Sequence, residues 1–233
     1  MAGKEATIYI VDVGATTEEC HNGRVESDLE YGMRYVWDKI AETMSANRTT
    51  LTVGVVGLRT DETSNLQYDN ADDDDKESYE YISVFKEMGP MKMSDLKPLQ
   101  QKITPSTTSD GDAVSAIVVA IELMEKHTAL KSGLPGKYKR KIVLLTDGQG
   151  SISDDDIVPI ADRINEFNIE LVVMYVLAII CFMLLNVLVV LISMILSLGL
   201  RRKIRTRTKF VTSPQSRIQT HNIRQGTKNF SEN

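Results

Sequence analysis

Short apolar segments with the character of β-strands alternate with amphipathic segments of helical period along residues 1–174. The expected strands cover 6–11, 51–58, 81–85, 141–146 and 169–174, and the expected helices cover 28–45, 94–103, 114–124 and 155–166. Consecutive parallel strands need a long crossover connection, which a helix supplies. The alternation therefore predicts an α/β, Rossmann-like fold with a mostly parallel sheet, helices on both faces and one antiparallel edge strand at 81–85.

A long apolar segment follows this domain directly. Residues 175–200 contain no Asp, Glu, Lys, Arg or His, and a bilayer core needs about 20 apolar residues in a helix. We therefore expect one long hydrophobic helix over 175–200 that could serve as a transmembrane segment, with Arg201, Arg202 and Lys203 on the cytoplasmic side. The tail at 201–233 is basic, and we expect it to be disordered.

Charge divides the chain in the same way. The whole sequence has 27 Lys and Arg residues against 32 Asp and Glu residues. Nine of these bases and one of the acids lie in the tail, which leaves 18 bases and 31 acids in residues 1–174, a net charge of −13. A domain this acidic is a poor general binder of nucleic acid, because phosphates attract clusters of Lys and Arg. One of the two cysteines, Cys181, lies in the apolar segment, so cysteine usage favours a reducing compartment over a disulfide framework.

Two expected strands end in an aspartate. Asp12 follows the strand at 6–11, with Thr16 four residues later, and Asp147 follows the strand at 141–146. Ligands of open α/β sheets bind at the carboxyl ends of the strands. Because Mg²⁺ binds carboxylate and other oxygen atoms in an octahedron, Asp12, Thr16 and Asp147 are the candidate metal ligands.

The motifs at these strand ends resemble those of von Willebrand factor A domains, in which an apolar strand ends in Asp-x-Ser-x-Ser and a later strand ends in Thr-Asp-Gly. The resemblance implies a divalent cation held by these residues and by a Thr from a third loop. This chain has Asp12, Thr16 and Asp147, but Gly14 offers no hydroxyl and the third loop at 109–112 contains no Thr. Mg²⁺ needs about six oxygen ligands, so we expect a degenerate site that holds no metal, and no cofactor elsewhere.

A closer resemblance covers roughly residues 4–174. Four segments resemble, in order, parts of the N-terminal domain of the large subunit of the Ku heterodimer. They are the Asp-Val-Gly-x-Thr motif at 12–16, the Val-Gly-Val-Val-Gly-Leu-Arg-Thr-Asp segment at 53–61, the helical segment at 112–122 and the strand at 142–147. The resemblance implies a nuclear complex that binds DNA ends in double-strand break repair by non-homologous end joining, with a role in telomere maintenance. It implies three kinds of partner: the other Ku subunit, DNA ends reached through the complex, and end-joining and telomere proteins.

The family pattern stops near Met174. In the Ku large subunit a β-barrel that helps to enclose DNA follows, so we expect the domain at 1–174 to be incomplete at its C-terminal edge. The segment at 175–233 is either a genuine anchor, which would place the chain in a membrane, or sequence of the kind that a translated intron produces.

Two other functional classes stay open. A membrane-anchored A domain with a degenerate metal site would act as an adhesion or receptor module. Ku large subunits are also described as subunits of an ATP-dependent DNA helicase, but the sequence has no Gly-x-x-x-x-Gly-Lys-Ser/Thr loop to bind phosphates. We identify no catalytic residue and expect no enzymatic activity from this chain.

Overall fold

Strands and helices alternate along the chain, as expected. The computed structural model describes residues 3–73, 75–153 and 157–176. The strands are β1 (Lys4–Asp12), β2 (Leu51–Leu58), β3 (Ile82–Gly89), β4 (Tyr138–Thr146) and β5 (Ile169–Tyr175). The longer helices are α1 (Asp28–Ser45), α3 (Met93–Lys102), α4 (Ala113–Thr128) and α5 (Ile157–Glu166), and the short helical segments are η1 (Ala15–Glu18), α2 (Leu66–Asn70) and η2 (Lys76–Tyr79).

The described strands form one mixed, mostly parallel sheet in the order β3-β2-β1-β4-β5. β1 is parallel to β2 and β4, and β4 is parallel to β5. β3 is antiparallel to β2 at the edge of the sheet, which confirms the expected antiparallel strand. Asp12 pairs with Leu58 of β2, and Val11 pairs with Leu145 of β4. The C-terminal ends of β1, β2 and β4 therefore lie next to one another, at the same end of the parallel strands.

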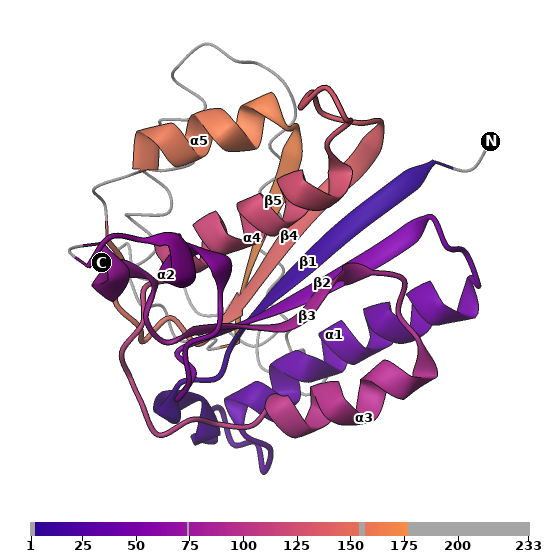
Figure 1. Ribbon diagram of the computed structural model, residues 1–233. Coiled ribbons are helices and arrows are strands. Elements are labelled where there is room, and N and C mark those ends of the chain that lie inside the picture. The colour runs from indigo at the N-terminus through magenta and orange to yellow at the C-terminus, as the bar shows by residue number, and fades with distance from the viewer. Residues whose placement is uncertain (1–2, 74, 154–156, 177–233) are drawn as a thin grey trace, which may run out of the picture.

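Helices cover both faces of the sheet. α1 and α3 lie on one face, and α4 and α5 lie on the other (Figure 1). Side chains of a strand point alternately to opposite faces, and β1 follows this rule: Ile8 and Ile10 belong to the core cluster under α4, whereas Tyr9 and Val11 belong to the cluster under α1. The near-continuous burial of β1 agrees with a strand that is covered on both sides.

Polar side chains set the starts of the two longest helices. The Ser27 hydroxyl accepts a hydrogen bond from the backbone N of Glu30, and the Glu30 carboxylate accepts one from the backbone N of Ser27, which makes a capping box for α1. The carboxylate of Asp112 accepts a hydrogen bond of 2.6 Å from the backbone N of Ser115. Asp112 therefore caps α4.

The structure differs from the expected elements at several places. α4 continues to Thr128, four residues beyond its expected end, and β4 begins at Tyr138, three residues before its expected start. The polar segment after β2 contains α2 and η2, two short helical segments that lie outside the expected ranges. β3 continues to Gly89, four residues beyond its expected end. β5 continues to Tyr175, so the residue expected to begin the hydrophobic helix pairs with Thr146 in the sheet instead.

The rest of the expected hydrophobic helix and the basic tail, residues 177–233, lie outside the described residues, and both stay predictions from the sequence. Within the part of the chain that the structure describes, no helix is both long enough and apolar enough to cross a membrane.

Candidate functional site

The expected site residues come together at the C-terminal ends of the parallel strands. Asp12 ends β1, Thr16 lies in η1 just after it, and Asp147 follows β4. The hydroxyl of Thr16 donates a hydrogen bond of 2.5 Å to Asp147 Oδ2. The side chains of Asp12 and Asp147 are each only 1% exposed. Two carboxylates buried so completely need a compensating positive charge.

Arg59, which the sequence interpretation did not single out, supplies that charge. It follows β2 directly, and its side chain is completely buried. Its Nε and Nη2 atoms donate to the two carboxylate oxygens of Asp12 at 2.6 Å each, and Nη2 also donates to Asp147 Oδ1 at 2.6 Å. Its Nη1 atom donates to Thr16 Oγ1 at 3.1 Å. The guanidinium therefore contacts all three residues that the sequence predicts as metal ligands.

Three glycines surround the Arg59 side chain. A Cβ atom built on Gly14 would lie 2.4 Å from Arg59 Nε, and Cβ atoms on Gly111 and Gly150 would lie 3.2 Å and 3.3 Å from Arg59 carbons. Contacts under 3.0 Å essentially never occur for a real Cβ atom. Gly14, which looked like a missing hydroxyl ligand, thus makes the space in which the guanidinium lies.

The two carboxylates have further hydrogen bonds. Asp12 Oδ2 accepts one of 2.6 Å from the Thr146 hydroxyl, and Asp12 Oδ1 accepts one of 3.1 Å from the backbone N of Gly14. Asp147 Oδ1 accepts one of 3.0 Å from the backbone N of Gln149. Every carboxylate oxygen of the pair therefore has a partner inside the protein, as buried polar groups require.

The segment just before the third loop, residues 106–108, supports Arg59 from the backbone side. The Ser106 hydroxyl donates a hydrogen bond of 2.6 Å to the carbonyl of Arg59, whose φ angle is +57°. Thr107 donates from its backbone N and its hydroxyl to Asp61 Oδ1, at 2.8 and 2.7 Å. These bonds hold the turn after β2 in the left-handed conformation that directs Arg59 into the site.

Burial and charge act against each other within the cluster. Burial raises the pKa of Asp12 above its ordinary value, and the charge of Asp147 adds to the increase. The hydrogen bonds and positive charge of Arg59 lower the pKa of Asp12, but they do not cancel the effect of burial. Burial alone would lower the pKa of Arg59, but Asp12 and Asp147 outweigh it and raise the pKa above its ordinary value. The guanidinium is therefore a permanent cation at this position.

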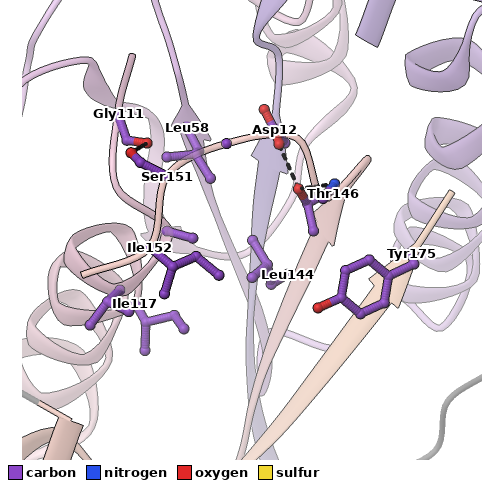
Figure 2. A pocket seen from close by; sticks show the side chains of 13 residues that line it. Asp12, Leu58, Gly111, Ile117, Leu144, Thr146, Ser151, Ile152 and Tyr175 are labelled. Carbon is purple, nitrogen blue, oxygen red and sulfur yellow. Dashed lines mark hydrogen bonds between the residues drawn. The ribbon is translucent and has the colours of Figure 1, made fainter. Parts of the chain in front are cut away.

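A pocket next to the cluster is lined mainly by apolar side chains. Figure 2 shows Leu58 beside the hydrogen bond between Thr146 and Asp12, and Leu144, Ile117 and Ile152 below that bond. These side chains keep water away from one side of Asp12, which is the cause of the burial effect on its pKa. Because both oxygens of Asp12 are already bonded to Arg59, the pocket offers a substrate no free base from this residue.

The described residues bring together no other cluster with metal-binding character. Among residues 3–73, 75–153 and 157–176, no group of three or more His, Cys, Asp and Glu side chains is arranged to hold a metal ion.

Comparison with known proteins identifies the family. The family model described as Ku70/Ku80 N-terminal alpha/beta domain matches residues 6–169. This chain belongs to the Ku N-terminal domain family. Its α/β fold, with the mixed and mostly parallel sheet described above, is the fold class that the sequence predicts.

Curated relatives of this Ku N-terminal domain are similar over about three quarters of the chain. The protein named ATP-dependent DNA helicase II subunit 2 of Neurospora crassa is 50% identical over 174 residues, which are 75% of this chain and 23% of the relative. The protein of the same name from Chaetomium globosum is 50% identical over 173 residues, 74% of this chain and 22% of the relative. That of Schizosaccharomyces pombe is 35% identical over 171 residues, 73% of this chain and 23% of the relative. The chain thus spans less than a quarter of the length of these relatives.

A solved structure of the SpRpn10 VWA domain is also similar. Its TM-score is 0.49 at 13% sequence identity, over 74% of this chain and 75% of that chain.

Proposed function

We propose that this chain supplies the N-terminal protein-docking domain of a Ku-type heterodimer, which binds DNA double-strand ends in non-homologous end joining. The family membership supports the complex, and the curated relatives carry the name of a DNA helicase subunit. Within that complex we assign residues 1–174 to contacts with proteins, and DNA contacts to parts of the longer relatives that this chain does not match. A nuclear location and a role in telomere maintenance follow from the same assignment.

The observation that carries the proposal is the position of Arg59. We propose that its guanidinium takes the place of a divalent cation among Asp12, Thr16 and Asp147, so that the site is structural. An A domain that binds ligands through a metal needs an open coordination position, and here the three residues are bonded to a side chain of the same protein. This arrangement disfavours the alternative of a metal-dependent adhesion module. It also provides no phosphate-binding group, so we expect no ATP hydrolysis from this domain.

Charge supports the separation of docking from DNA binding. Residues 1–174 have a net charge of −13, and a field of that sign repels a duplex instead of attracting it. A domain with this charge fits the outside of a DNA-binding complex better than its DNA channel.

A chimera of two relatives tests the proposal. In the Neurospora crassa protein, the 174 matching residues are replaced by the corresponding residues of this chain, and the chimera is expressed in cells that lack their own large Ku subunit. We expect it to assemble with the other subunit, to bind blunt DNA ends as tightly as the parent, and to restore end joining. The 50% identity over this region makes the exchange conservative.

A deletion control makes the result specific. A parent protein without the N-terminal domain should keep measurable binding to DNA ends but should fail to restore end joining. If that deletion restores end joining as well as the chimera does, the docking role is wrong. If the chimera assembles and binds DNA ends but end joining stays absent, this domain does not carry the docking function of the family.

A further inference from the structure

The connection from α4 to β4 has a charge opposite to that of the domain. Residues 126–141 hold six of the 18 bases in residues 1–174 and none of the 31 acids. Four of these bases are exposed lysines: Lys126, Lys131, Lys137 and Lys139. Lys4 of β1 lies nearby, with its Nζ atom 5.2 Å from the centre of the Tyr138 ring. The connection lies at the end of the sheet where β4 begins (Figure 1), which is the end opposite to that at which Arg59 follows β2.

Two exposed leucines lie within this positive region. Leu130 is 55% exposed and Leu134 is 63% exposed. The backbone N of Leu130 donates a hydrogen bond of 2.8 Å to the carbonyl of Leu134, next to an antiparallel bridge between Ala129 and Pro135. Residues directly opposite each other in an antiparallel pair share a face. The two leucines therefore lie on the same face of a hairpin, and Lys131 and Lys137 are close to them in the sequence. We call residues 129–137 the basic hairpin.

The basic hairpin is held in a fixed shape. Its turn contains Gly133 at a φ of +79°, and the backbone N of Gly136 donates a hydrogen bond of 2.9 Å to the carbonyl of Thr128. The buried guanidinium of Arg140 donates to the carbonyl of Gly136 at 2.7 Å, to the Thr128 hydroxyl at 2.8 Å and to the carbonyl of Phe167 at 3.0 Å. A loop that is already ordered loses less conformational entropy when a partner binds.

We propose that the basic hairpin, together with Lys4 and Lys139, is a docking surface for an acidic segment of a partner protein that carries a large apolar side chain. The lysines would pair with the carboxylates of the segment, and the apolar side chain would cover Leu130 and Leu134. This inference rests on the docking role proposed above and gives that role one location and one kind of partner.

The hairpin fits a protein segment better than it fits nucleic acid. Exposed leucines add nothing to contacts with phosphates, and Tyr138, the aromatic side chain beside the hairpin, is half-buried with Lys4 Nζ 5.2 Å from its ring centre. Outside 126–141, residues 1–174 hold 12 bases against 31 acids, so the surrounding field repels the long charged backbone of a duplex. A short acidic segment can reach the hairpin without extending across the acidic surface.

A binding titration tests this surface. The probe is a fluorescein-labelled synthetic peptide in which Asp and Glu residues flank a central Leu-Phe pair, and it is titrated with the full chain by fluorescence anisotropy. The test variant is Leu134→Ser/Lys137→Glu. The matched control is Met93→Ser/Lys97→Glu, which changes a 76% exposed methionine and an exposed lysine of α3. We expect the test variant to bind the peptide about tenfold more weakly and the control to stay within about twofold of the unmodified chain.

Three results would overturn the inference. The first is equal binding by the test variant and the control, provided that both unfold at the temperature of the unmodified chain. The second is equally tight binding of a peptide with Ser-Ser in place of Leu-Phe, because charge alone would then explain the contact. The third is displacement of the peptide by a blunt DNA duplex, together with weaker binding of that duplex to the test variant. The surface would then be a binding site for nucleic acid. The peptide titration needs neither the other Ku subunit nor end joining in cells, so its failure is distinguishable from failure of the chimera.

Discussion

Gly14 and Arg59 fit together only because Gly14 has no side chain: a Cβ atom at this position would lie 2.4 Å from Arg59 Nε. The backbone of Gly14 has a φ of −55°, which any residue adopts, so the requirement for glycine comes from the neighbouring guanidinium and from no property of the turn. The absence of a hydroxyl at residue 14 and the presence of a buried cation at residue 59 are thus two parts of one arrangement.

Removal of the guanidinium should destabilise the fold strongly. Arg59→Ala leaves the carboxylates of Asp12 and Asp147 buried without their cation, a change that typically costs about 3–5 kcal/mol. Urea unfolding at neutral pH measures the loss in the free energy of unfolding. The control is Arg34→Ala, because Arg34 is 63% exposed and contacts Glu26 and the Tyr31 ring at the surface; its effect should stay within about 0.5 kcal/mol. Similar losses in the two variants would show that the buried cluster contributes little.

A methyl group at residue 14 should act through Arg59. Gly14→Ala should lower the free energy of unfolding by about 1–3 kcal/mol, because it forces the guanidinium out of its position. In the Arg59→Ala background the same substitution has space and should cost less than about 1 kcal/mol. A double-mutant cycle measures this coupling. Gly89→Ala serves as the control, since its Cβ would meet only Lys86 Nζ at 4.0 Å. Additive losses in the cycle would separate Gly14 from Arg59.

Magnesium should not bind at Asp12, Thr16 and Asp147. The three side chains are bonded to Arg59, and Mg²⁺ demands near-ideal octahedral geometry from its ligands. Isothermal titration calorimetry should therefore show no saturable binding at low-millimolar Mg²⁺. Saturable binding that Asp12→Ala abolishes would mean that the ion displaces the guanidinium.

His127 should make stability depend on pH in the mildly acidic range. Burial lowers the pKa of His127 below its ordinary value of 6.5, so the unfolded chain binds the proton more tightly than the folded domain does. The stabilisation that the neutral imidazole gives the folded domain is fully present above pH 6.5. It is lost as the pH falls from 6.5 through the pKa of the folded state. The free energy of unfolding, measured at several pH values across this range, should fall less steeply in His127→Phe than in the unmodified protein. Parallel curves would assign the pH dependence to other groups.

Residues 1–176 on their own should bind DNA ends no more tightly than about 10⁻⁴ M at physiological salt, the weak limit of non-specific binding. The net charge of −13 in residues 1–174 is the reason. Fluorescence anisotropy of a labelled blunt duplex at two salt concentrations measures the affinity. Submicromolar binding that resists salt would place the DNA-binding function of the complex in this domain.

The sheet and the two aspartates could be predicted from the sequence because their signals are local. Apolar runs with turns at both ends define the strands, and Asp12 and Asp147 follow two such runs immediately. The extension of β3 to Gly89 and of β5 to Tyr175 could not be predicted as easily, because pairing with a neighbouring strand decides where an edge strand ends. The short helices within the polar segment after β2 are too brief to show a helical period.

Arg59 was not identified because its role depends on contacts that are distant in the sequence. After the apolar run of β2 an arginine looks like the first exposed residue of a polar loop. One signal could have indicated it: β2 also ends at the edge of the sheet where Asp12 and Asp147 lie, and two buried carboxylates need a cation. The absence of a hydroxyl at Gly14 was consistent with an empty site, but the structure shows that the space is used by the chain itself.

An ion held by a protein leaves when its concentration in solution falls, and a chelator can remove it. The positive charge at the end of β2 cannot leave, because it is attached to the backbone through the Arg59 side chain. We therefore expect that the supply of divalent ions in the cell does not loosen this end of the domain, and that the surfaces around it keep one shape whether such ions are scarce or abundant.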